Sequence, residues 1–142
     1  MKKFFSMICA LVIGLVGCSV QEVEVQTTPT HNVYEMNITA TQLSNDSVGR
    51  EWSKTYWCKG EAIESKTRWT VPIGETSVLE VDIMITEHDK FPDVGRGALA
   101  VELSNGFESS TIITVTENKG AYKGNQAQWE IVCKVVLVGE KW

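Results

Sequence analysis

The sequence is poor in the residues and motifs of common enzymes. Its 142 residues include only two histidines, His31 and His88. It contains no Gly-x-Ser-x-Gly elbow, no His-Glu-x-x-His zinc motif and no glycine-rich phosphate-binding loop. Binding is therefore favoured over catalysis as the class of function.

Positive charge is also scarce. The chain has 13 basic and 18 acidic residues, and removing the first 17 residues with Lys2 and Lys3 leaves a net charge of about −7. Nucleic-acid binding depends on a basic face that neutralises phosphates. A nucleic-acid partner is therefore disfavoured.

The sequence has no hydrophobic run of comfortable transmembrane length. Residues 1–17, MKKFFSMICALVIGLVG, have two lysines, a short apolar run and then small residues. This order is typical of an export signal. An uncleaved transmembrane helix is the less favoured alternative because the run is short.

The tetrapeptide at positions 15–18, Leu-Val-Gly-Cys, resembles the lipobox of bacterial lipoproteins. The resemblance implies that Cys18 carries a diacylglycerol and that the chain is cut just before it. The lipid would then hold the protein on the extracytoplasmic face of a bacterial cell membrane. Residues 18–31 are polar, threonine-rich and contain Pro29, which indicates a flexible tether. A secretory peptide with an incidental cysteine is the alternative.

Residues 32–142 show no convincing helical period and many two-residue alternations. Leu79, Val81, Ile83 and Ile85 are apolar at every second position, the pattern of a strand with one buried face. Similar patterns predict strands at 34–40, 52–58, 63–71, 99–103, 111–116 and 129–138, with a tight turn at 59–61. The sequence thus predicts one all-β domain, an antiparallel β-sandwich of seven or eight strands.

Two cysteines remain after the export signal and Cys18 are set aside. Cys58 and Cys133 both fall on the predicted core faces of their strands. An even pair in an exported protein favours a disulfide, worth about 4 kcal/mol if unstrained. A pair of buried free thiols is the alternative.

Acidic residues collect on the connection that follows the strand ending at Ile85. Glu87, Asp89 and Asp93 lie within seven residues, and Pro92 and Gly95 punctuate the segment. This grouping predicts either a cation site or an ordinary solvated loop.

Two segments, ITATQLSNDSVGREW and ITEHDKFPDVGRGALAVEL, resemble the calcium-binding loop segments of C2 domains. By this resemblance Asp46 matches the aspartate of the first loop, Glu87 and Asp89 match an Asp-x-Asp pair, and Asp93 matches a third aspartate. The resemblance implies a C2-like sandwich, with an immunoglobulin-like sandwich as the alternative. The chain also resembles small exported bacterial proteins without a settled function.

Calcium binds six to eight oxygen atoms, and several acidic residues are candidates to supply them. The candidate ligands are Asp46, Glu87, Asp89, Asp93 and Glu117. The residues Phe91, Tyr122 and Asn125 are candidate contacts for a protein or small-molecule ligand at the cell surface. The alternative is a cell-envelope enzyme, or a regulator of one, whose loop carboxylates perform acid–base chemistry.

The lipobox leads to a direct test. We expect the Cys18→Ala variant to lose the lipid anchor, because the acylated sulfur is absent. Metabolic labelling with a fatty-acid probe should mark the wild type and miss the variant. Equal labelling of both proteins would show that Cys18 is not the lipidation site.

Overall fold

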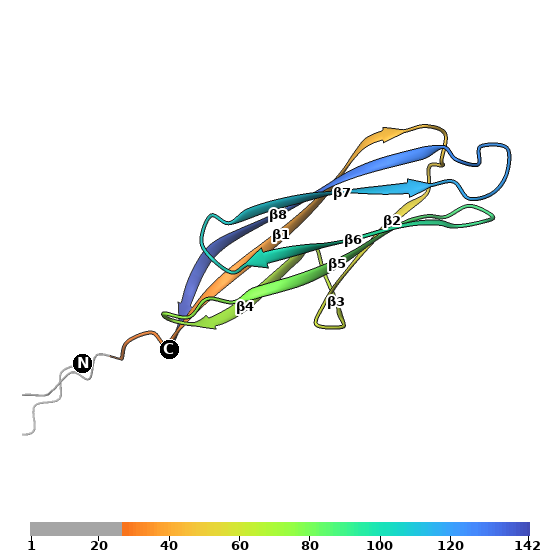
Figure 1. Cartoon of the computed structure of the whole chain (residues 1–142). Helices are drawn as coiled ribbons and strands as arrows, with labels where there is room; N and C mark the ends of the chain where they lie inside the picture. Colours follow the sequence, from red (N-terminus) through yellow and green to blue (C-terminus); the bar gives the residue numbers. More distant parts are fainter. Residues whose placement is uncertain (1–26) are drawn as a thin grey trace, which may run out of the picture.

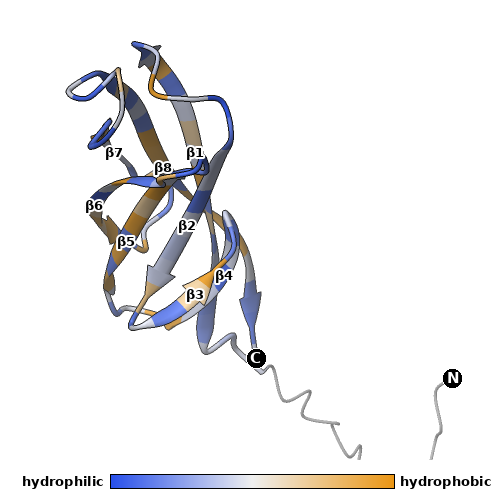
Figure 2. Cartoon of the chain, turned by 90° about the vertical axis from the view of Figure 1, so that its right-hand side faces the viewer, coloured by the Kyte–Doolittle hydropathy of each residue, from blue (hydrophilic) through white to orange (hydrophobic). Residues whose placement is uncertain are grey.

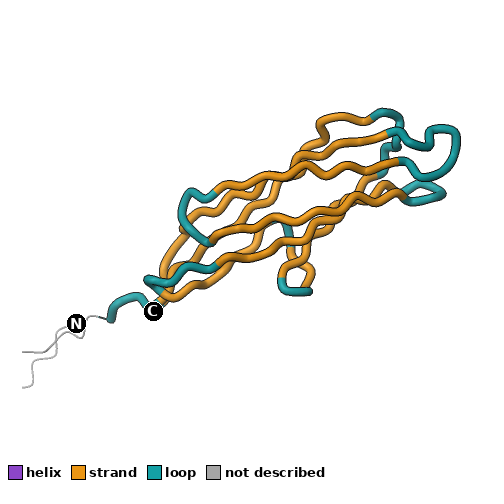
Figure 3. The backbone as a smooth tube through the Cα atoms, viewed as in Figure 1, coloured by secondary structure: helices purple, strands orange, loops and turns teal. Residues whose placement is uncertain are grey.

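The computed structural model describes residues 27–142, which form eight strands in two four-stranded antiparallel sheets (Figures 1 and 3). The strands are β1 (His31–Asn45), β2 (Trp52–Cys58), β3 (Glu61–Ile63), β4 (Lys66–Pro72), β5 (Val78–Glu87), β6 (Asp93–Glu102), β7 (Glu108–Thr116) and β8 (Gln126–Lys141). The first sheet has the order β4-β1-β8-β7 and the second has the order β3-β2-β5-β6. The predicted antiparallel β-sandwich is confirmed. The predicted export signal and Cys18 lie outside the described residues.

Apolar side chains at alternate positions form the core between the sheets. In β5 the residues Leu79, Val81, Ile83 and Ile85 are all buried, whereas the residues between them face outward. Figure 2 shows the corresponding apolar bands along β5, β6 and β8. Each fully buried aliphatic side chain contributes about 1.5 to 3 kcal/mol, so these inward rows hold the sheets together.

The two sheets approach most closely where β6 faces β7. A Cβ atom on Gly95 would lie 2.6 Å from the carbonyl oxygen of Thr114, and one on Gly97 would lie 3.1 Å from Ile113. At position 95 only glycine permits this spacing, because the nearest atom belongs to the backbone. Gly95, which the sequence pattern suggested as a loop residue, is therefore part of a strand and closes one side of the sandwich.

Two predicted boundaries were wrong. The predicted strand at 63–71 is two strands, because β3 pairs with β2 in the second sheet whereas β4 pairs with β1 in the first. The short connection at 64–65 carries the chain between sheets, and the backbone N–H of Ile38 donates to the carbonyl of Ser65 over 2.7 Å. In addition, β1 continues to Asn45, since β8 offers it a partner along this whole length.

The ends of the sandwich differ. His31 at the start of β1 pairs with Lys141 at the end of β8. The connections at 46–51, 88–92 and 117–125 lie together at the opposite end, which we call the loop end (Figure 1). Backbone hydrogen bonds join them, for example from His88 N–H to the Glu51 carbonyl over 2.7 Å. In residues 27–142 no helix is long and apolar enough to cross a membrane.

The structure does not contain the predicted disulfide. Cys58 and Cys133 are both free and buried, Cys58 in the second sheet and Cys133 in the first. Both side chains do face the core, as the strand pattern indicated. Burial raises the pKa of both thiols, to about 11 for Cys133, so the neutral thiol is the favoured form.

We therefore expect the native protein to react slowly with a thiol-alkylating reagent at pH 8, since the reactive thiolate is scarce and buried. Unfolding in urea without a reductant should release two reactive thiols in the mature domain. Mass mapping after alkylation would locate them. A linked Cys58–Cys133 peptide under these conditions would restore the disulfide prediction.

Candidate functional site

Three inward-facing rows of side chains end in carboxylates at the loop end. Glu87 continues the buried row of β5, and Asp93 begins the buried row of β6. Glu117 follows Ile113 and Val115 of β7 at the same two-residue spacing. All three are buried, with Glu87 and Asp93 each only 2% exposed. We call Glu87, Asp93 and Glu117 the carboxylate cluster.

Glu87 and Asp93 lie directly opposite each other on neighbouring strands. Like charges in such a pair destabilise a sheet. The Oε2 atom of Glu87 and the Oδ2 atom of Asp93 are both buried without a hydrogen-bond partner. Within residues 27–142, the ion pairs involve only Glu35 and Glu108 as acids, so no basic side chain neutralises the cluster.

Asn118 holds one side of Asp93. Its backbone N–H and its side-chain amide both donate to Asp93 Oδ1, over 3.1 and 2.9 Å. These two bonds fix the carboxylate and leave its second oxygen free for another partner. The sequence pattern gave no signal for Asn118, because its role depends on the contact between the β7–β8 connection and β6.

Gly49 lies directly against Glu87. Its φ of 154° is unfavourable for other residues, and a Cβ atom there would overlap the Glu87 carboxylate. The neighbouring backbone N–H of Arg50 interacts with this carboxylate and favours its charged form. The connection at 46–51 thus covers Glu87 with backbone. This contact is not evident from the sequence.

Electrostatics within the cluster favour protonation. Burial is the main cause that raises the pKa of Glu87, and the charges of Asp89, Glu117 and Asp93 add to it. Burial also raises the pKa of Glu117, with further contributions from Asp93 and Asp89. These couplings place four of the five predicted calcium ligands close enough to influence one another.

Asp46 and Asp89 differ from the cluster. Asp46 is exposed, and its backbone N–H donates to the Gln126 carbonyl over 2.9 Å. It is not among the charges that shift the pKa of Glu87 or Glu117. Asp89 is exposed, and its Oδ1 accepts the Phe91 backbone N–H over 2.6 Å. Asp89 therefore shapes the β5–β6 connection and adds negative charge from outside.

The predicted ligand contacts surround this end of the molecule. Phe91 is 46% exposed and Tyr122 is 59% exposed. The Nζ atoms of Lys90 and Lys119 lie 5.7 and 5.0 Å from the centre of the Phe91 ring. Tyr122 borders an open hollow of about 370 Å³ that is also lined by Asn45, Ser47, Gly49 and Arg50.

Asn125 has a structural role in the β7–β8 connection. Its carbonyl accepts the Glu117 N–H and its own N–H donates to the Tyr122 carbonyl, both over 2.9 Å. Trp52 pairs with Glu87 across the sheet and packs edge-on against Trp129 with ring centres 5.3 Å apart.

The carboxylate cluster is not arranged as a complete metal-binding site. In the part of the chain that the structure describes, no three His, Cys, Asp or Glu side chains are arranged as a set of metal ligands. The unpartnered oxygens of Glu87 and Asp93 can accept either a proton or a cation. No family model and no curated protein matches the chain, so the C2 resemblance stays a prediction.

The raised pKa values imply a specific pH dependence of stability. The folded state binds more protons than the unfolded state between the ordinary carboxylate pKa and the raised values. The free energy of unfolding should therefore fall as pH rises through this window. Glu87→Gln with Glu117→Gln should flatten the slope and raise the melting temperature at pH 7.

Glu75→Gln is the matched control, since Glu75 is an exposed residue near the opposite end, in the β4–β5 connection. Urea unfolding from pH 4.5 to pH 8 measures the slope. The lowered pKa of Glu35, caused mainly by its hydrogen bond to Lys66, acts at lower pH, where its protonation costs stability. A double variant with the wild-type slope would contradict the assignment.

Proposed function

We propose that the protein is a lipid-anchored extracytoplasmic binding module whose loop end binds its ligand in a calcium-dependent manner. The lipobox motif supports the anchor, and the position of β1 supports the orientation. The tether enters β1 at one end of the sandwich, and the carboxylate cluster lies at the other. A ligand site at the loop end is therefore displayed away from the anchored end.

The uncompensated Glu87–Asp93 pair carries the proposal. Burying a charge without a partner is costly, and each of these carboxylates has one oxygen without any partner. A divalent cation bound between them would remove both the repulsion and the unsatisfied acceptors. Extracellular sites of this kind commonly bind calcium with a Kd of about 10⁻⁴ to 10⁻³ M.

Calcium binding would require the surrounding connections to adjust. The hard cation takes six to eight oxygens, more than Glu87 and Asp93 supply. Glu117 and Asp89 are the additional carboxylates, since the charge of each raises the pKa of Glu87. Turning Asp89 inward and drawing Glu117 towards the cation would reposition the connections at 88–92 and 117–125, which carry Phe91 and Tyr122. In this way the cation would organise the exposed aromatic contacts for a ligand.

The test is calcium-dependent stability. Calcium at ten times its Kd should add about 1.4 kcal/mol to the free energy of unfolding, a shift of a few degrees in Tm. Glu87→Gln removes one cluster charge and should abolish most of this shift while leaving the calcium-free protein at least as stable as wild type. Differential scanning calorimetry in calcium and in chelator measures both effects.

Glu75→Gln again serves as the control and should keep the full calcium shift. Magnesium at the same concentration separates a specific site from general charge screening, because magnesium demands a tighter octahedral arrangement. A wild-type Tm that ignores 10 mM calcium would refute the calcium dependence and leave protonation as the way the cluster is neutralised.

A further inference from the structure

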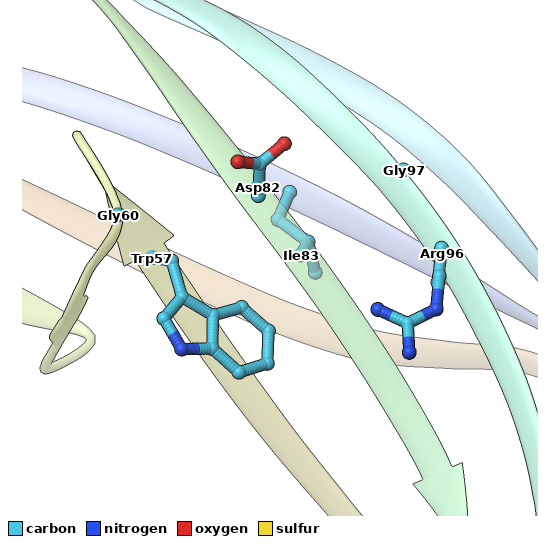
Figure 4. A pocket seen from close by; sticks show the side chains of 6 residues that line it. All are labelled: Trp57, Gly60, Asp82, Ile83, Arg96 and Gly97. Atoms are coloured by element: carbon cyan, nitrogen blue, oxygen red, sulfur yellow. The ribbon is translucent and has the colours of Figure 1, made fainter.

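A second hollow lies on the outer face of the second sheet, away from the carboxylate cluster. It has a volume of about 300 Å³ and is lined by Trp57, Gly60, Asp82, Ile83, Arg96 and Gly97 (Figure 4). Trp57 and Trp52 belong to the same strand but have opposite parity, so their side chains face opposite sides of the sheet. They are five positions apart along the strand, about 16 Å.

The strand register explains the hollow. Trp57 of β2 lies opposite Asp82 of β5, which in turn lies opposite Ala98 of β6. The next outward-facing row contains Arg96. Ala98 is too small to cover the sheet beside the Trp57 indole. The β2–β3 turn at Lys59 and Gly60 has positive φ at both positions and bounds the other side.

Two side chains of opposite charge flank the indole without pairing with each other. Asp82 and Arg96 are exposed, and neither takes part in an ion pair in the described part of the chain. Figure 4 shows the Arg96 guanidinium extending towards the Trp57 ring and the Asp82 carboxylate on the neighbouring strand. The hollow thus offers an aromatic face, a hydrogen-bond acceptor and a group of hydrogen-bond donors.

We propose that this hollow binds a sugar ring of an oligosaccharide. The C–H face of a pyranose stacks on an indole, and its hydroxyls both donate and accept hydrogen bonds. Sugar hydroxyls would therefore hydrogen-bond both the Asp82 carboxylate and the Arg96 guanidinium. A ligand with a single charge would meet one flanking group of its own sign.

The outer face of the second sheet is open beside the hollow, which favours an oligosaccharide over a small zwitterion as the ligand. The outward residues of β6 next to the hollow, Ala98 and Ala100, are both small and exposed. A chain of sugar units can therefore continue along the sheet from the ring bound at Trp57. A free amino acid would place both of its charges in an open, solvated hollow, where ion pairs contribute little.

The experiment is an NMR titration of the mature domain with cellohexaose, chitohexaose and maltohexaose in the presence of chelator. In the wild type the reporter is the indole N–H of Trp57, assigned with the Trp57→Phe variant. In the two Trp57 variants, which lack this group, the backbone N–H signals of Gly60 and Gly97 report binding. At least one hexasaccharide should shift this signal saturably. Trp57→Ala should weaken binding at least tenfold, whereas Trp57→Phe should bind more tightly than Trp57→Ala because it keeps an aromatic ring.

Asp82→Asn tests the polar contact without removing the ring. It should weaken binding several-fold, and Glu75→Gln should leave binding unchanged, since Glu75 is exposed in the β4–β5 connection and does not line the hollow. The proposal is overturned if none of the three sugars shifts Trp57 saturably, if Trp57→Ala or Asp82→Asn binds as tightly as wild type, or if only glycine, titrated in parallel, shifts the signal. Chelator keeps this result independent of the calcium site.

Discussion

The packing of inward-facing apolar rows between two sheets is the constraint on which the other features depend. The buried apolar residues of both sheets form one core cluster, and the close approach of β6 to β7 requires glycine at position 95. Because the side-chain period of a strand is fixed at two, extending a buried row by one step places the next odd residue in the same environment. That rule brings Glu87, Asp93 and Glu117 under the protein surface.

The carboxylate cluster therefore occupies inward-facing positions that apolar core residues could fill. Apolar residues at positions 87 and 93 would continue the packing without repulsion, and the inward parity gives no structural reason for acids there. Strained or unsatisfied groups that persist in a well-packed domain are concentrated at functional sites. The backbone of Gly49 lies against the Glu87 carboxylate, and the burial of the cluster strengthens its interaction with any proton or cation that enters.

Most of the fold and part of the site can be predicted from the sequence. The alternation of apolar and polar residues was sufficient to predict the sandwich, because each strand buries one face against one core. It failed at residues 61–72, since a strand pattern does not show which sheet each strand joins. The acidic residues at 87, 89, 93 and 117 were identified by composition, and the odd parity of 87, 93 and 117 was a further signal of burial. Asn118 and Gly49 were beyond prediction, because their contacts depend on how three separate connections meet.

The pairing of β1 with β8 affects how the domain forms. These strands are the first and last of the described fold, yet they lie side by side in the middle of the first sheet. The outer strands β4 and β7 have partners nearer in sequence, but the pairs β4-β1 and β7-β8 join into one sheet only when residues about 100 positions apart meet, and closing so long a loop is entropically slow. The first sheet is therefore complete only after β8, the last strand, has paired with β1. A chain that ended before Gln126 would keep β4 paired with β1 but would leave β7 without a strand to join it to them, so the sandwich is closed by the last strand to be synthesised in the described fold.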